Sequence, residues 1–272
     1  MTALLLTYLG FFTGIQPLTS APMSVLLEDV PKEGVTTVIA CWDGQVFKDG
    51  AQCFASLDSL EGDEAVPSFA VIATNAASLS GKGLKWKLAN GSLEVSDEED
   101  CYDENGRKVR LQSKGIFREV HPEMKVKKQP LKNKRYRKIV AQALKVKTVR
   151  LLSLFRVDLE GDGVEEVLFR ATYKAKGTVR EAVGYRKVLG KGNVVTKVIK
   201  DSEGGGDSGG TDFAGVSDLN GDGFLEVLVT SSAGDNGMGN HSMAQFNFSL
   251  WQLTGEPKRL AGASCMERTR WD

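Results

Sequence analysis

Histidine is scarce in this sequence of 272 residues, which contains only His121 and His241. Two histidines leave little room for histidine-based metal binding or acid–base catalysis. The four cysteines form no Cys-x-x-Cys pair and none lies near a histidine, which argues against a zinc site. Lysine plus arginine and aspartate plus glutamate each number 35, so the formal net charge is zero. A globally cationic surface for nucleic acid or membrane binding is therefore excluded.

Long apolar runs are also missing, and no segment approaches the length of a membrane-spanning helix. The longest candidate runs from Ala3 to Ile15 and matches the apolar part of a secretory signal. We therefore predict a signal peptide over residues 1–20 and an exported protein, secreted or held in the cell envelope at the periplasm or cell surface. No lysine or arginine precedes the run, so a buried first strand or helix in a cytoplasmic protein stays the alternative.

The four cysteines are an even number, which fits an exported chain with disulfides. Four cysteines allow three pairings, and the sequence does not choose among them. In an exported chain, one of these pairings would make Cys41–Cys53 a local bridge and tie the last strand to the first half through Cys101–Cys265. In a reducing compartment the same residues would be buried thiols.

The sequence has enough apolar residues (41%) for a sizeable core, and its 30 glycines indicate many turns. Residues 24–118 consist of short strand and turn patterns, which predict an N-terminal β-rich region. Within this region, Asn90-Gly91 separates two strand-like runs at 84–88 and 92–95, a signal for a two-residue hairpin.

Residues 125–150 contain eleven lysines or arginines and no acid. Apolar side chains recur there at helical spacing, which predicts one amphipathic helix near 134–145: Tyr136, Ile139, Val140, Ala143 and Leu144. The basic residues fall mostly off this apolar face. We expect a solvated surface, with a polyanion-binding patch for phosphates or acidic polysaccharide as the alternative. Only one aromatic residue is present, so specific nucleic-acid binding is not expected.

After the basic segment the same pattern occurs twice, at a spacing of 60 residues. Each unit has a strand, a short acidic loop, a second strand and two further strands. The eight predicted strands cover 149–157, 164–173, 183–189, 194–199, 212–217, 224–231, 245–253 and 258–262. Four short strands per repeat are typical of a blade-like antiparallel β-meander.

The acidic loops carry oxygen-bearing side chains at positions 1, 3, 5 and 9, with glycine at positions 4 and 6. Position 7 can offer only its backbone carbonyl. The predicted metal ligands are Asp158, Glu160, Asp162, Val164 and Glu166 in the first loop, and Asp218, Asn220, Asp222, Phe224 and Glu226 in the second.

Several oxygens on one short, glycine-rich turn suit Ca²⁺, which takes about six to eight oxygen ligands. An EF-hand needs an acid at position 12, where this chain has Phe169 and Val229, so here the loop joins two strands. Converging carboxylates would repel one another without a cation. We therefore predict two Ca²⁺ sites, with a metal-free Asp/Gly-rich turn as the alternative.

The two loops, DLEGDGVEEVLF and DLNGDGFLEVLV, resemble those of FG-GAP and VCBS-type repeat proteins. The resemblance covers roughly residues 134–265 and extends to a group of bacterial secreted proteins with this repeat. It implies a calcium site in each loop and a role in adhesion, recognition or scaffolding rather than catalysis.

A closed propeller needs about four blades, and only two are clear here. We therefore expect a mainly β fold with some α. Antiparallel β-meander blades would form an incomplete propeller-like or sandwich-like arrangement packed on the first half of the chain. The predicted function is that of an exported, calcium-binding, non-enzymatic protein with a binding, adhesion or structural role and an unidentified protein or polysaccharide partner.

An enzymatic alternative rests on Gly206–Gly210, which reads GDSGG, as around the nucleophile of chymotrypsin-like proteases. His121, Asp158 and Ser208 even follow that family's order. However, His121 lacks that family's sequence context, and Asp158 belongs to the acidic loop. A hydrolase with a site in the N-terminal half or in the loops, with Ser208 as its candidate nucleophile, remains the second hypothesis.

Overall fold

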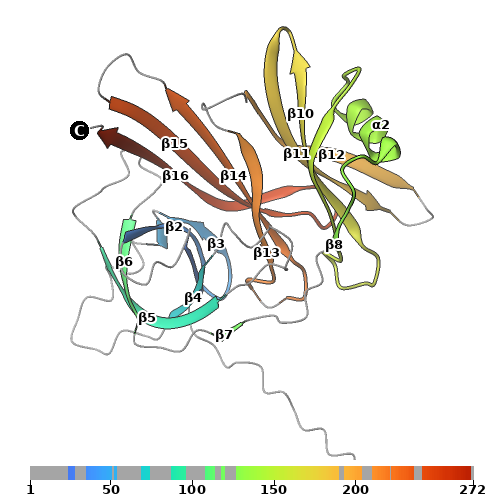
Figure 1. Ribbon diagram of the computed structural model, residues 1–272. Helices are drawn as coiled ribbons and strands as arrows, with labels where there is room; N and C mark the ends of the chain where they lie inside the picture. Colours follow the sequence, from blue (N-terminus) through green and yellow to red (C-terminus); the bar gives the residue numbers. More distant parts are fainter. Residues whose placement is uncertain are drawn as a thin grey trace, which may run out of the picture.

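The computed structural model is mainly β, with antiparallel sheets and one helix of ten residues (Figure 1). This confirms the predicted fold class. The structure describes residues 24–27, 35–50, 52–53, 69–73, 87–95, 108–113, 118–119, 127–189, 193–203, 210–220, 222–235 and 241–270. The predicted signal peptide at 1–20 lies outside these ranges.

The N-terminal region forms a seven-stranded sheet in the order β1-β4-β5-β6-β2-β3, with β7 paired to β5 and β1 also paired to β2. One pair, β1 with β4, is parallel. The strands are β1 (Ser24–Leu27), β2 (Val35–Trp42), β3 (Phe47–Asp49), β4 (Phe69–Ala73), β5 (Lys87–Val95), β6 (Lys108–Ser113) and β7 (Arg118–Glu119).

The predicted hairpin at Asn90-Gly91 is wrong, because β5 runs straight through these residues. Asn90 pairs with Ala70 of β4, and Gly91 pairs with both Phe69 of β4 and Ser113 of β6. Strands on both sides thus hold this dipeptide extended, and pairing overrides its local preference for a turn.

The rest of the chain forms two antiparallel meanders. The first sheet has the order β12-β11-β10-β9-β8 and the second the order β13-β14-β15-β16. All eight strands predicted from the repeated pattern are present. The elements are β8 (Lys127–Lys128), β9 (Arg150–Val157), β10 (Glu166–Ala175), β11 (Thr178–Val188), β12 (Val194–Glu203), β13 (Thr211–Ser217), β14 (Glu226–Asp235), β15 (His241–Gln252) and β16 (Lys258–Arg270).

The predicted amphipathic helix is α2 (Lys134–Ala143), capped by Asn133, whose side chain accepts the Tyr136 N–H at 3.2 Å. Its buried Val140 packs in a cluster with Leu154 and Phe169 of the first sheet. In Figure 1 the helix covers the face of this sheet that points away from β13–β16. The basic residues of α2 are exposed, as the spacing predicted.

The main core fills the space between the two meanders and reaches the N-terminal sheet. Residues alternate along β10, so that Phe169 faces α2 and Leu168 faces the second sheet. The largest fully buried members of this core are Ile39, Leu159, Leu168, Tyr185, Phe213, Leu228 and Leu250. Ile39 belongs to β2, so the first half of the chain packs directly against the paired meanders.

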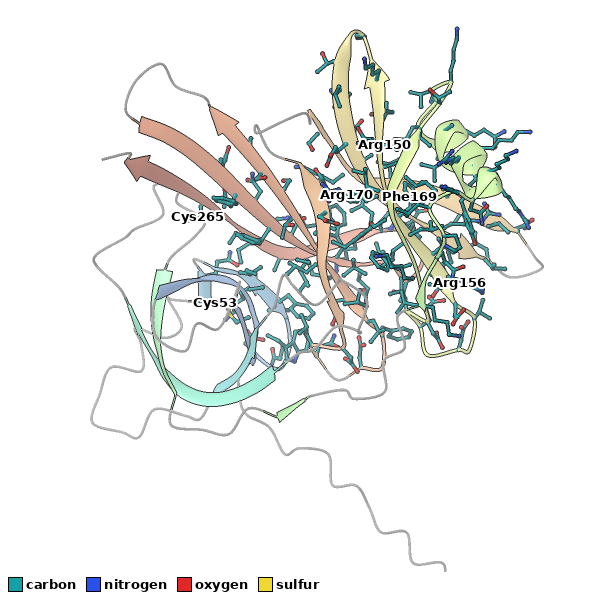
Figure 2. All side chains as sticks on the ribbon, viewed as in Figure 1. Cys53, Arg150, Arg156, Phe169, Arg170 and Cys265 are labelled. Atoms are coloured by element: carbon teal, nitrogen blue, oxygen red, sulfur yellow. A yellow bond between two sulfur atoms is a disulfide. The ribbon has the colours of Figure 1, made fainter. Side chains whose placement is uncertain are left out.

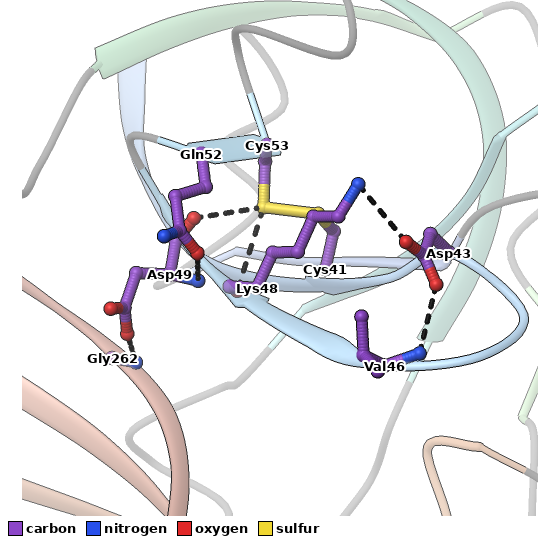
Figure 3. Close-up of a disulfide and its surroundings, with 8 residues drawn as sticks. All are labelled: Cys41, Asp43, Val46, Lys48, Asp49, Gln52, Cys53 and Gly262. Carbon is purple, nitrogen blue, oxygen red and sulfur yellow. Dashed lines mark hydrogen bonds and ion pairs between the residues drawn. A yellow bond between two sulfur atoms is a disulfide. The ribbon is translucent and has the colours of Figure 1, made fainter.

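Two polar links add to this core. Arg170 of β10 contacts Glu181 of β11 at 2.7 Å and Asp212 of β13 at 2.5 Å, which joins the two meanders (Figure 2). Asp49 of β3 accepts the backbone N–H of Gly262 in β16 at 2.6 Å, which joins the N-terminal sheet to the second meander (Figure 3).

The structure resolves part of the cysteine pairing that the sequence left open: Cys41–Cys53 is a disulfide and ties β2 to the segment after β3 (Figure 3). Cys265 in β16 is also disulfide-bonded and buried. Cys101, the partner considered for it, lies outside the described residues.

Candidate metal centre

Both acidic loops join neighbouring antiparallel strands, the first between β9 and β10 and the second between β13 and β14. The last residue before each loop pairs with the glutamate at position 9: Val157 with Glu166, and Ser217 with Glu226. The loops therefore occupy the same place in the two meanders, and no helix flanks either of them.

Each loop is held on the core by a leucine and a glutamate. The position 2 leucines, Leu159 and Leu219, are buried in the main core. The position 9 glutamates are only 1% exposed, although glutamate is among the residues least often buried. Glu166 Oε2 accepts the Leu159 N–H at 2.9 Å, and Glu226 Oε2 accepts the Leu219 N–H at 2.7 Å. The buried glutamate at position 9 thus bonds back to position 2 and connects the two ends of the loop.

The first aspartate of each loop binds two backbone N–H groups. Asp158 accepts from Asp162 at 3.2 Å and from Gly163 at 2.8 Å. In the second loop, Asp218 accepts from Asp222 at 3.1 Å and from Gly223 at 2.9 Å. The match between the loops shows that the same residue pattern folds the same way twice.

The aspartate at position 5 of each loop also accepts a backbone N–H. Asp162 Oδ1 accepts the Val164 N–H, and Asp222 Oδ1 accepts the Phe224 N–H, both at 2.8 Å. The turn also requires a left-handed backbone, with φ of 83° at Gly163 and 86° at Gly223, which glycine adopts without strain.

The loops differ at position 3. In the first loop, Glu160 forms an ion pair with the ammonium of Lys187, which is 6% exposed. In the second loop, Asn220 is neutral and bonds within the loop: its amide donates to Asp222 Oδ2 at 3.0 Å, and its Oδ1 accepts the Asp222 N–H at 3.1 Å.

The two buried glutamates also differ in their electrostatics. Burial raises the pKa of Glu226 to about 8, and the negative charges of Asp218 and Asp222 act in the same direction. Burial raises the pKa of Glu166 as well; the negative charge of Glu160 adds to the rise, while the Leu159 N–H and the positive charge of Lys187 oppose it. The charged neighbours of Glu166 thus include a lysine, whereas those that act on Glu226 are both acids.

The hydrogen bonding of Glu226 is incomplete. Among the residues that the structure describes, its Oε1 is the only buried carboxylate oxygen without a hydrogen-bond partner. A buried polar atom without a partner is unfavourable by about 1–3 kcal/mol, and by more when charged. This oxygen belongs to one of the ligands that the sequence predicted for the second loop.

The two loops contact each other. The Leu225 N–H donates to the carbonyl of Leu159 at 2.9 Å. A Cβ added at Gly161 would lie 3.5 Å from the carbonyl oxygen of Gly223. The structure therefore brings all ten predicted ligand residues into one paired loop region, although they are 60 residues apart in sequence.

In this arrangement the aspartates turn toward the N–H groups of their own loops. Within the described ranges, no three or more His, Cys, Asp or Glu side chains form a cluster able to hold a metal ion. The position 7 side chains point outward, with exposed fractions of 42% for Val164 and 38% for Phe224. The predicted Ca²⁺ sites stay a prediction.

Sequence reasoning missed Lys187, which lies on β11, far from the loop motif. Its role follows from strand register, because it is one residue beyond Arg186, which pairs with Val167. Of the residues considered for a protease, His121 and Ser208 lie outside the described residues, and Asp158 is bonded to its own loop.

Comparisons of this chain with protein-family models, with curated proteins and with solved structures found no match. Within the described residues, no helix has the length and apolar character that crossing a membrane requires.

Proposed function

We propose that this chain is an exported, non-enzymatic calcium-binding protein with a binding, adhesion or structural role. In this proposal Ca²⁺ stabilises the strand–loop–strand turns, and a loop face contacts a protein or polysaccharide partner. The proposal is motivated by the resemblance of the loop residues to those of FG-GAP and VCBS-type repeats. It is supported by the matching hydrogen bonds of the two loops.

The observation that carries the proposal is the unpartnered Oε1 of Glu226. Asp218 and Asp222 add negative charge beside this buried carboxylate. A divalent cation would supply the missing partner and offset the repulsion among these groups. The residues that would hold it are Asp218, Asn220, Asp222 and Glu226, with the carbonyl of Phe224.

The disulfides support export. Cys41–Cys53 and the disulfide-bonded Cys265 fit an oxidising compartment, because cytosolic reductants keep most thiols reduced. Extracellular calcium sites bind at about 10⁻⁴–10⁻³ M, so a weak site of this kind would fill only where calcium is abundant.

Thermal unfolding with Ca²⁺ and with a chelator tests the proposal. At ten times Kd the linkage relation gives a gain of about 1.4 kcal/mol. We expect the melting temperature to rise by several degrees in millimolar Ca²⁺ and to fall back when EGTA is added. An unchanged melting temperature up to tens of millimolar Ca²⁺ would rule out calcium binding.

A matched pair of variants localises the effect. Asp218→Asn should abolish the calcium-dependent rise. Asp43→Asn is the control, because Asp43 also accepts two backbone N–H groups, from Gln45 and Val46, but lies outside the acidic loops. This control should keep the full calcium response.

The exposed side of α2 favours a second candidate function, polyanion binding. Its apolar face is buried against the first sheet, while Lys134, Arg135, Arg137 and Lys138 face solvent. Retention on heparin that falls steeply with salt would support this function. Replacing these four residues with glutamine should remove the retention, and retention that persists in the variant would contradict it.

A further inference from the structure

Strand register places Lys187 and Gln252 at equivalent positions in the two meanders. In the second meander, Glu226 pairs with Gln252 and Val227 pairs with Trp251. In the first meander, Val167 pairs with Arg186, so the residue beyond, Lys187, stands opposite Glu166. The residue opposite the position 9 glutamate is therefore a lysine in the first meander and a neutral glutamine in the second.

The contacts of the first loop show what this lysine does. The Lys187 ammonium forms an ion pair with Glu160 Oε1, and the Lys187 side chain is only 7% exposed. Burying a lysine is costly unless its charge is paired, so this contact keeps the Glu160 side chain turned toward β11. Glu160 is the predicted position 3 ligand, and the ammonium already pairs with one of its two carboxylate oxygens.

The second loop has the opposite arrangement. Its position 3 residue is Asn220, which is neutral and bonded to Asp222. Its other two acidic ligand positions are Asp218 and Asp222, and the neutral Gln252 stands opposite Glu226. The buried carboxylate oxygen without a partner also belongs to this loop.

We propose that Lys187 serves as the built-in cation of the first loop and that Ca²⁺ binds at the second loop alone. This inference rests on the proposed calcium-binding function. Formal charge does not separate the loops: with every predicted ligand counted as ionised, the four carboxylates and the Lys187 ammonium of the first loop and the three carboxylates of the second both sum to −3. The separation comes from position, since an ammonium bonded to the position 3 ligand repels a second cation from the same loop.

Isothermal titration with Ca²⁺ into the full chain tests this assignment by its stoichiometry. The wild type should bind one ion. Glu226→Gln should weaken binding at least tenfold, because it removes charge from the buried ligand of the second loop. The conservative variant Lys187→Arg should still bind one ion, since it keeps the positive charge.

The decisive variant converts the first loop into a copy of the second. The pair Glu160→Asn and Lys187→Gln reproduces Asn220 and Gln252 and removes both charges together, so neither is left buried alone. This variant should bind two ions. The reciprocal pair, Asn220→Glu with Gln252→Lys, should abolish binding by the otherwise unchanged protein.

The possible results distinguish a failure of the one-site assignment from a failure of the proposed calcium binding. Two ions bound by the wild type, or one ion bound by the first double variant, would overturn the inference and leave calcium binding intact. No binding heat with the wild type at millimolar Ca²⁺ would overturn the proposed function itself.

Discussion

The backbone N–H of Leu225 donates a hydrogen bond of 2.9 Å to the carbonyl oxygen of Leu159, and this bond joins the two acidic loops. Leu159 is 1% exposed and lies in the core shared by the two meanders. This bond couples the two loops, so ordering of one loop should reduce the motion of the other.

Hydrogen exchange tests this connection. Ca²⁺ should lower deuterium uptake in residues 218–226, where the ion is proposed to bind, and also in residues 158–166. The reason is that a more ordered second loop holds Leu225 in place as a donor to Leu159. The exposed turn at Lys176 and Gly177 is the internal control and should not change. Protection confined to residues 218–226 would show that the loops are independent.

Gly184 in β11 is a position where packing leaves no space for a side chain. A Cβ there would lie 2.3 Å from the carbonyl oxygen of Lys197 and 2.5 Å from Cζ of Phe169. Gly184→Ala should lower the free energy of unfolding by about 1–3 kcal/mol in a urea titration. The exposed control Lys174→Ala should change it by less than about 0.5 kcal/mol. A Gly184→Ala variant as stable as the control would contradict the close packing of β10, β11 and β12.

The Cys41–Cys53 disulfide closes a short chain segment, with a sequence separation of 12. In the chain-entropy description, a loop of this size gives about 3 kcal/mol of stability by restricting the unfolded chain. The double variant Cys41→Ala and Cys53→Ala should lose about this amount in chemical denaturation. Because Cys265 is untouched, its own disulfide is unaffected. Equal stability of variant and wild type would mean that the bond contributes nothing.

Asp43, in the turn between β2 and β3, should stabilise the folded state in a pH-dependent way. The Val46 N–H, the Lys48 ammonium and the Gln45 N–H lower the pKa of Asp43 from 3.8 to about 2. Because the native state releases this proton more easily than the unfolded state, the stabilisation is fully present above pH 3.8. It is lost as the pH falls toward about 2.

Urea titrations of wild type and Asp43→Asn at a series of pH values measure this contribution. The difference in free energy of unfolding should be constant near neutral pH and should shrink between about pH 4 and about pH 2. A difference that stays the same throughout this window would show that the Asp43 charge has no role in the turn.

Much of the second half of the fold could be predicted, because its signals are local. The repeated strand–loop–strand pattern predicted both meanders, and the helical spacing around Val140 predicted α2. The loop residues also adopt matching hydrogen bonds in both copies, as identical spacing leads one to expect. In each case residues that are close in sequence determine the structure.

What could not be predicted depends on contacts between distant residues. Asn90-Gly91 has the composition of a turn, but strands from elsewhere in the chain pair with it on both sides. Lys187 gave no signal as part of a loop, because only the register of β10 with β11 brings it to Glu160. The pairing of the loops through Leu159 and Leu225 likewise follows from sheet packing.

Anomalous diffraction from a crystal grown in millimolar Ca²⁺ tests the central claim most directly. The account predicts a calcium peak in the second loop, beside the Oε1 of Glu226 that lacks a partner in this structure. It predicts no peak in the first loop, where the Lys187 ammonium contacts Glu160. Well-ordered loops without a peak in either one would contradict the account.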